Sequence, residues 1–242
     1  MPARALAVEV VKLTRAFGPK PVLRGVDLAL EQGERLALFG ANGAGKTTLL
    51  RVLATLARPD AGTARVGGLD VAREADAVRR IVGYVGHQPH IYEELTVREN
   101  LRFFARMYGV RDAAGRAEAL IARMGLAARA GDRARTLSRG LLQRLALARG
   151  IVQEPDVLLL DEPETGLDAQ AFGLLRDLVE ERAVAGRTTI FTTHAAERGL
   201  ELASVVAVLA RGRITYAGPA AGLDAAALRT ILDDSAGTGR GR

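Results

Sequence analysis

A glycine-rich loop near the N-terminus carries the strongest chemical signal in the sequence. It matches the pattern G-x-x-x-x-G-K-S/T at every position, and its residues are Gly40, Ala41, Asn42, Gly43, Ala44, Gly45, Lys46, Thr47 and Thr48. The glycines allow a tight backbone turn that directs N–H groups at phosphate oxygens, above the positive end of the following helix. Lys46 would contact the β- and γ-phosphates, and the Thr47 hydroxyl would contact Mg²⁺. The loop predicts a nucleoside triphosphate site.

The segments on either side of the loop support this prediction. The apolar run 36–39 predicts a strand before the loop, and residues 48–53 predict a helix after it. The alternative, a chance match in an ordinary glycine-rich loop, does not explain this order. Lysine occurs only at positions 12, 20 and 46, although the chain has 34 basic residues. Lys46 stands out because the loop interior suits a compact ammonium better than a planar guanidinium.

Two acidic residues follow a second apolar run. Asp161 and Glu162 come directly after residues 157–160, which predict a fully buried parallel strand. Carboxylates at such a strand end are costly unless a cation lies there, and Mg²⁺ at the loop supplies one. We expect Asp161 to hold the metal through water and Glu162 to take a proton from the attacking water. The alternative is a strand-terminating turn with solvated acids.

Further polar residues follow two other predicted strands. His194 ends the run 188–193, and Gln88 follows the run 81–85. Ligands of α/β proteins bind at the carboxyl ends of such strands. We therefore predict a polar contact from His194 to the γ-phosphate and an amide contact from Gln88. The other two histidines, at positions 87 and 90, receive no role.

The predicted elements divide the chain into a core and an insertion. Strands are expected at 6–11 and 26–30, with a turn over 13–18 between them. Phe17 in that turn could stack on a nucleotide base, although its residue type alone favours a core position. From Thr96 to about position 128 the pattern becomes helical, beginning with a capping box at 96–99. The expected domains are a core of 1–88 and 150–218, a helical lobe of 89–149, and a short helix with a disordered tail from Ser235 in 219–242.

Composition sets broader limits. The chain of 242 residues is 48% hydrophobic, has a mean hydropathy of +0.08 and contains no apolar run near the ~20 residues of a membrane helix, which predicts a globular protein that is soluble on its own. Its first residues lack the apolar core of a signal peptide. The absence of cysteine excludes disulfides and thiolate metal sites. The net charge of +6 is spread along the chain, and only six Phe and four Tyr could stack on bases, which argues against a nucleic-acid partner.

Taken together, the motifs over about 6–218 resemble those of the ATP-binding subunit of an ABC transporter. The matching segments are Gln88 at the Q-loop, 137–141 at the signature, 166–168 at the D-loop, His194 at the switch position and Phe17 as the base-stacking aromatic. The resemblance reverses the core interpretation of Phe17. It implies an α/β fold with a P-loop NTPase (RecA-like) core, a parallel sheet, an N-terminal antiparallel β subdomain and an inserted α-helical lobe.

The resemblance also implies partners and residue roles. Two copies would form a head-to-tail homodimer that sandwiches two ATP molecules, each between one copy's loop and Ser138 and Gly140 of the other. Asp168 would belong to the ATP site, and Gln88 would join Thr47 and Asp161 around Mg²⁺. The catalytic set would comprise Glu162, His194, Gln88 and Lys46. A separate transmembrane permease would hold the protein at the cytoplasmic face of the inner or plasma membrane.

Two residues depart from the family signature. Arg139 stands where the family usually has Gly, and Leu141 where it has Gln. Because Ser138 and Gly140 are retained, activity is expected to survive. Arg139 would either add positive charge at the dimer interface or pack against the helical lobe.

The type of transporter is a finer question. Residues 92–101, the Leu-Ser-Arg-Gly signature and the short C-terminal region are similar to the haem-exporter type of the cytochrome c maturation system. A drug, lipid or polysaccharide exporter subunit is the alternative.

A soluble ABC-type ATPase acting on DNA or ribosomes is a different class of protein. The span 89–137 is too short for the coiled-coil insertion of DNA-repair members, and the chain has one such domain, whereas translation factors join two. A metabolic P-loop kinase would not explain residues 138–140 or His194.

Overall fold

The computed structural model of the chain describes residues 5–237. Its strands are β1 (Leu6–Phe17), β2 (Lys20–Glu31), β3 (Arg35–Phe39), β4 (Ala61–Val66), β5 (Leu69–Asp70), β6 (Val82–Val85), β7 (Val157–Asp161), β8 (Thr188–Thr192), β9 (Val205–Ala210) and β10 (Arg213–Pro219). Its α-helices are α1 (Lys46–Leu53), α2 (Ala75–Ile81), α3 (Val97–Met107), α4 (Ala113–Arg123), α5 (Arg139–Gly150), α6 (Ala169–Val184), α7 (Ala196–Leu202) and α8 (Ala225–Ala236).

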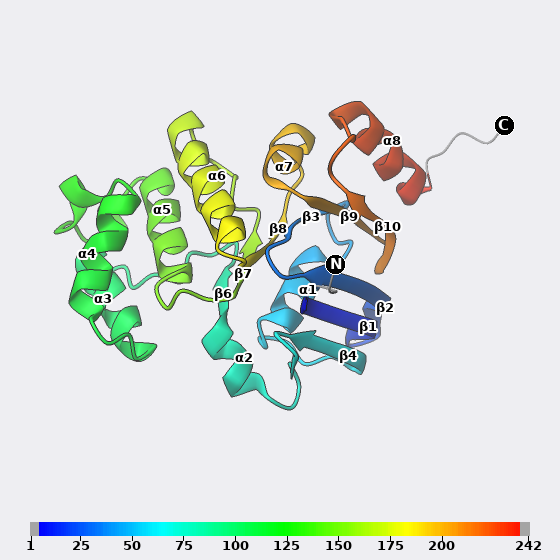
Figure 1. Cartoon of the computed structure of the whole chain (residues 1–242), viewed down its shortest axis with the longest axis horizontal. Coiled ribbons are helices and arrows are strands. Elements are labelled where there is room, and N and C mark those ends of the chain that lie inside the picture. The colour runs from blue at the N-terminus through cyan, green and yellow to red at the C-terminus, as the bar shows by residue number, and fades with distance from the viewer. Residues whose placement is uncertain (1–4, 238–242) are drawn as a thin grey trace.

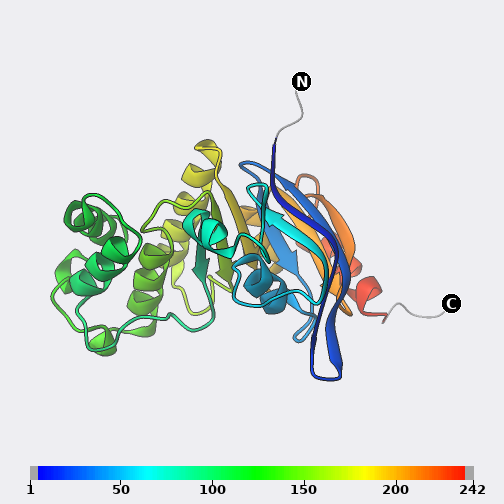
Figure 2. The ribbon, with the colours of Figure 1, turned by 90° about the horizontal axis from the view of Figure 1, so that it is seen from below.

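The strands form two sheets, which confirms the predicted fold class. The larger sheet has the order β10-β9-β3-β8-β7-β6, with parallel pairing from β9 to β6 and an antiparallel edge at β10. The smaller, antiparallel sheet has the order β2-β1-β4-β5. Figure 2 shows this smaller sheet lying over the end of the molecule opposite the helical lobe. Because β3, β8 and β7 are parallel neighbours, the segments that follow them emerge at one edge.

Buried apolar strands explain the larger sheet. Every residue of β7 and β8 is buried, and four of the five residues of β3 are buried. Strands covered on both faces read as continuous rather than alternating apolar runs. Helix α1 lies between the two sheets, while α5, α6 and α7 cover the opposite face of the larger sheet (Figure 1). The loop 40–48 therefore joins a buried strand of the larger sheet to a helix packed between the two sheets.

The inserted region is helical, as expected. Helices α3, α4 and α5 stand side by side at one end of the molecule (Figure 1), and residues 89–149, all of which the structure describes, contain no strand element. The capping box that begins α3 is confirmed: Thr96 accepts the N–H of Glu99, and the Glu99 carboxylate accepts the N–H of Thr96 at 2.8 Å. This pairing satisfies two N–H groups that the first turn cannot use.

The N-terminal hairpin is longer than the sequence predicted. The expected turn over 13–18 is wrong, since β1 continues to Phe17 and the chain reverses after it. The register shifts between Val10 and Leu13, and the intervening Lys12 has φ +47°. The N–H of Lys12 donates to Asp27 at 2.8 Å, and Leu13 is buried again. A β-bulge thus interrupts the alternation that sequence reasoning uses to follow a strand.

The C-terminal helix is also longer than expected. Disorder was predicted from Ser235, but α8 includes this residue and is closed by Gly237 at φ +76°. Asp224 caps its first turn by accepting the N–H of Ala227 at 2.7 Å, and the fully buried Leu228 fixes it to the core. The rest of the predicted tail, 238–242, lies outside the described residues. Within residues 5–237, each helix is too short or too polar to cross a bilayer.

Candidate nucleotide-binding and hydrolysis site

The loop 40–48 has the strand, loop and helix order that its sequence predicted. It joins the end of β3 to the start of α1. Gly40 has φ +148°, and a Cβ placed on it would lie 2.2 Å from the carbonyl oxygen of Leu209. Gly45 precedes α1 with φ +112°, and no side chain caps this helix. The N–H groups at the start of α1 therefore remain available for an anion, and the loop conformation requires glycine at both positions.

We expect Gly40→Ala to disrupt the loop. The added methyl would collide with backbone rather than with an adaptable side chain, so ATP affinity should fall by about 10-fold or more, and the melting temperature should also fall. Titration with a fluorescent ATP analogue and thermal unfolding would measure the two effects. The matched control is Gly173→Ala, because a Cβ there meets no atom within 4 Å and the helix α6 favours alanine. Unchanged ATP affinity in Gly40→Ala would contradict the steric argument.

The ammonium of Lys46 lies inside the loop. Its Nζ donates to the carbonyl oxygens of Gly40 at 2.7 Å and Ala41 at 3.3 Å. Lys46 is only 6% exposed, and burial lowers the pKa of its ammonium, while the charges of Glu162 and Asp161 act in the opposite direction. A buried cation is costly unless negative charge lies close to it. A triphosphate would supply that charge, so the residues present fit the ligand that the loop sequence predicted.

The side-chain oxygen atoms of Asp161 and Thr47 lie close together at the start of α1. The Thr47 hydroxyl lies 2.8 Å and 3.1 Å from the two carboxylate oxygens of Asp161, which is 5% exposed. Thr192 donates to the same carboxylate at 2.7 Å. Oxygen atoms of this kind suit Mg²⁺, which usually retains several waters and takes one or two protein ligands. The donor set therefore fits the predicted metal.

Glu162 and His194 meet beside Lys46. Oε1 of Glu162 lies 2.7 Å from Nε2 of His194, and that nitrogen lies 3.3 Å from Nζ of Lys46. Strand order explains this arrangement, since β8 lies between β3 and β7, and His194 follows β8. Glu162 has φ +53°, and its N–H donates to Thr192 at 2.9 Å. Strained backbone of this kind persists only where the surroundings hold it, and it gathers at functional sites.

The structure gives Phe17 and Gln88 different surroundings. Phe17 is 48% exposed, which removes the core interpretation, and the Arg15 guanidinium lies 4.9 Å from the centre of its ring. Gln88 lines a cavity of about 900 Å³ that extends to Thr47 and Asp161. His87 and His90, to which the sequence assigned no role, line the same cavity. Gln88 is thus placed on the path from the phosphate loop to the helical lobe.

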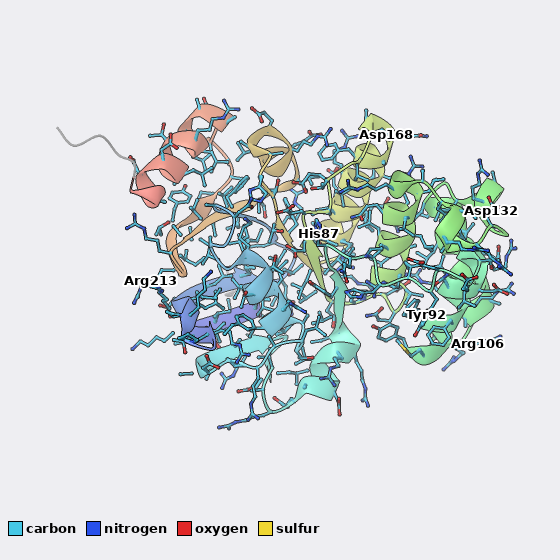
Figure 3. The ribbon with its side chains drawn as sticks, turned by 180° about the vertical axis from the view of Figure 1, so that it is seen from behind. His87, Tyr92, Arg106, Asp132, Asp168 and Arg213 are labelled. Carbon is cyan, nitrogen blue, oxygen red and sulfur yellow. The ribbon has the colours of Figure 1, made fainter. Side chains whose placement is uncertain are left out.

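The signature residues are not brought to the loop of their own chain. Ser138 caps α5 by accepting the N–H of Leu141 at 3.4 Å, and a Cβ on Gly140 would meet nothing within 4 Å. Asp168 caps α6 through the N–H of Ala171 at 2.7 Å. Figure 3 shows Asp168 at the upper margin of the molecule, away from His87 near its middle. Across residues 5–237, no hydrogen bond joins these three residues to the loop.

Arg139 contacts the segment that follows β7 of its own chain. Its Nε would lie 3.3 Å from a Cβ on Gly166, and the residue lines a small cavity of about 80 Å³ together with Asp161 and Glu162. Arg139 and the acidic pair of the same chain therefore border one cavity. The position of Arg139 beside Gly166 favours a packing role for this residue. The segment it packs against is the D-loop rather than the helical lobe.

Sequence reasoning missed two threonines of the site. Thr192 bonds both Asp161 and the backbone of Glu162, and Thr193 bonds a third acidic residue, Glu164. Both threonines are buried, at 0% and 1% exposure. The available signal was a pair of hydroxyl residues ending an otherwise buried strand immediately before His194, because buried polar groups need partners.

The fold and this geometry define a phosphate-loop ATPase. The ABC transporter family matches residues 23–165, and the chain belongs to this family. The protein therefore binds ATP and is an ATPase, as its relatives also indicate.

Two relatives and one solved structure show the extent of the similarity. The chain is 42% identical to the daunorubicin resistance ATP-binding protein DrrA3 of Streptomyces coeruleorubidus, over 88% of this chain and 68% of that protein. It is 40% identical to the Nod factor export ATP-binding protein I of Paraburkholderia xenovorans, over 86% of this chain and 69% of that protein. A structure described as the ATP binding subunit of an ABC transporter superposes with a TM-score of 0.86 at 27% identity, covering 95% of this chain and 99% of that one.

Proposed function

We propose that this protein is the ATP-hydrolysing subunit of an exporter and works with a separate transmembrane permease. The observation that carries this proposal is the contact of Lys46, His194 and Glu162 beside the Thr47 and Asp161 oxygens. The relatives concerned with daunorubicin resistance and Nod factor export favour the drug, lipid or polysaccharide class of cargo. They give no support to the haem-exporter type that residues 92–101 favoured.

Each residue of the site has a proposed task in hydrolysis. The N–H groups of the loop and the Lys46 ammonium bind the phosphates and orient the terminal one. Glu162 takes the proton of the attacking water at its carboxylate, and His194 donates a hydrogen bond to the γ-phosphate. Thr47, Gln88 and Asp161 would hold Mg²⁺, with Asp161 acting through water. Mg²⁺ supplies positive charge that neutralises the charge developing on the phosphate oxygens. Phe17 stacks on the base.

The second half of the site comes from another copy of the chain. The N-terminus of α5 presents Ser138 and the open face of Gly140, and a helix start of this kind attracts negative charge. In a head-to-tail homodimer these groups of one copy would contact the γ-phosphate bound by the other copy's loop, near Asp168. Hydrolysis would remove the bridging charge and loosen the interface.

The cavity beside Gln88 is the proposed permease contact. It is lined by basic side chains, which include Arg51, Arg79 and Arg149, and by the exposed apolar residues Leu56 and Met107. A surface with both kinds of group suits a short amphipathic segment of another protein. Through this contact the protein would lie at the cytoplasmic face of the membrane.

Mixing two inactive variants tests the composite site. Lys46→Ala damages the loop, and Ser138→Arg blocks the signature, so each variant alone should lack hydrolysis. The mixed dimer retains one intact pairing, and about half of the dimers should be mixed, so hydrolysis should return to roughly a quarter of the wild-type rate. A coupled phosphate-release assay measures this recovery.

The matched control mixes Lys46→Ala with the double variant Lys46→Ala/Ser138→Arg. No dimer in that mixture has an intact loop, and it should stay inactive. If the first mixture also stays inactive while wild type hydrolyses ATP, Ser138 does not act across an interface between copies.

A further inference from the structure

A buried acidic residue lies beside the hydrolysis site without a role in the scheme above. Glu164 follows β7 three residues after Asp161 and is only 7% exposed. Burial raises the pKa of its carboxyl above the usual range, and the charge of Glu162 acts in the same direction, while Thr193 and His194 oppose the shift. The other charged group facing it is Arg198 of α7, which approaches the Glu164 backbone carbonyl at 3.5 Å. Burial thus works against the charged form of this carboxyl.

The contacts of Glu164 join two loops of the site. The Thr193 hydroxyl donates to Oε1 of Glu164 and accepts the N–H of Ala195 at 3.0 Å. Thr193 is 1% exposed and immediately precedes His194. The segment after β7, which carries Glu162, is thus tied to the segment after β8, which carries His194.

A second connection joins the ends of β7 and β8. Thr192 accepts the N–H of Glu162 at 2.9 Å and donates to Asp161 at 2.7 Å. The contact between Glu162 and His194 is therefore held from both sides, by Thr192 at the strand ends and by Thr193 with Glu164 farther along the two loops. Two such attachments fix both the position and the direction of the loops, whereas one would leave a hinge.

The cost of Glu164 to the fold indicates that it does more than fill space. Its second oxygen, Oε2, is buried and has no hydrogen-bond partner within residues 5–237. A buried polar atom without a partner destabilises a protein, and an apolar side chain of similar size would avoid the penalty. The bond to Thr193 gives the acidic residue an interaction that such a side chain could not make.

We propose that Glu164 is a positioning residue, whose carboxyl accepts the Thr193 hydroxyl and thereby sets the contact between His194 and Glu162. This inference rests on the proposed function, because it assumes that Glu162 and His194 act in hydrolysis. Glu164 does not touch the nucleotide in this scheme. It acts on the rate of the chemical step and leaves ATP binding to the loop 40–48.

The test compares variants of the full chain by steady-state hydrolysis of ATP with Mg²⁺. Glu164→Leu and Thr193→Val each remove the bond, so kcat should fall by about 10-fold while the KM for ATP changes by less than about 2-fold. Glu164→Gln keeps an acceptor for Thr193 and should stay within about 2-fold of wild type. Both single variants break the same bond. The fall in kcat of the double variant Glu164→Leu/Thr193→Val should therefore be no greater than that of the single variant with the larger fall.

Two controls make the outcome decisive. Thr189→Val removes a hydroxyl that is equally buried on β8 but lies near its start, and it should leave kcat unchanged. Thermal unfolding and binding of a fluorescent ATP analogue show whether each variant is folded. Wild-type kcat in folded Thr193→Val, equal losses in Glu164→Gln and Glu164→Leu, or multiplying losses in the double variant would each overturn the proposal.

The variant Glu162→Gln separates failure of this inference from failure of the proposed function. If Glu162→Gln is inactive and Thr193→Val is fully active, Glu164 is not a positioning residue, but the hydrolysis scheme stands. If Glu162→Gln itself hydrolyses ATP at the wild-type rate, the role assigned to Glu162 is wrong, and the inference falls with it.

Discussion

Glu162→Gln is expected to abolish hydrolysis while leaving ATP binding intact. The Glu162 carboxylate is 2.7 Å from His194, and its side chain is 27% exposed, so it can contact both a water molecule and the histidine. An amide of the same shape cannot accept the proton, and loss of a general base slows such reactions by about 10²–10⁴-fold. Hydrolysis is measured as phosphate release. Because the bridging γ-phosphate is not removed, a dimer should also accumulate and be visible by light scattering with ATP and Mg²⁺.

The control for Glu162→Gln is the same substitution at a carboxylate outside the site. Glu180→Gln changes an exposed residue of α6 and should hydrolyse ATP at the wild-type rate. Near wild-type hydrolysis by Glu162→Gln would remove Glu162 from the role of base. Slow hydrolysis without dimer accumulation would retain that role and contradict the proposed link between ATP and the interface.

Lys46→Met is expected to weaken ATP binding itself. The ammonium lies inside the loop, and a hydrogen bond to a charged group contributes about 1.5–3 kcal/mol, so affinity should fall by roughly 10- to 100-fold. The nucleotide-free variant should be at least as stable as wild type, because methionine avoids burying a charge. Titration with a fluorescent ATP analogue and thermal unfolding with and without ATP measure both effects.

The pH dependence of stability gives this prediction a second readout. Burial lowers the pKa of Lys46 in the folded chain below the usual lysine value of 10.5. Between these two pKa values the unfolded chain binds more protons than the folded chain, so stability that depends on Lys46 rises with pH across that window. Wild type should therefore gain stability relative to Lys46→Met as the pH approaches 10.5. Lys20→Met, at the exposed first residue of β2, is the control. Unchanged ATP affinity in Lys46→Met would contradict the phosphate-site assignment.

Predictions from local spacing agreed best with the structure. The capping box at 96–99 and the helix after the loop 40–48 depend on residues that are close in sequence, and both are present. The N-terminal hairpin was underestimated because a bulge at Lys12 breaks the alternation while the strand continues. The helix α8 was cut short because its polar last turn resembles a solvated tail, yet Leu228 anchors it in the core.

The sequence by itself determined which chemical groups are present and that several of them follow buried strands. It therefore indicated a nucleotide loop, an acidic pair and a polar histidine, since residue type and spacing carry that information. Only the tertiary structure decided that His194 lies between Lys46 and Glu162, and that Glu164 holds Thr193. These residues come from segments far apart in the chain, and they meet because β8 pairs between β3 and β7. Strand order depends on the packing of the whole sheet, which spacing along the chain does not specify.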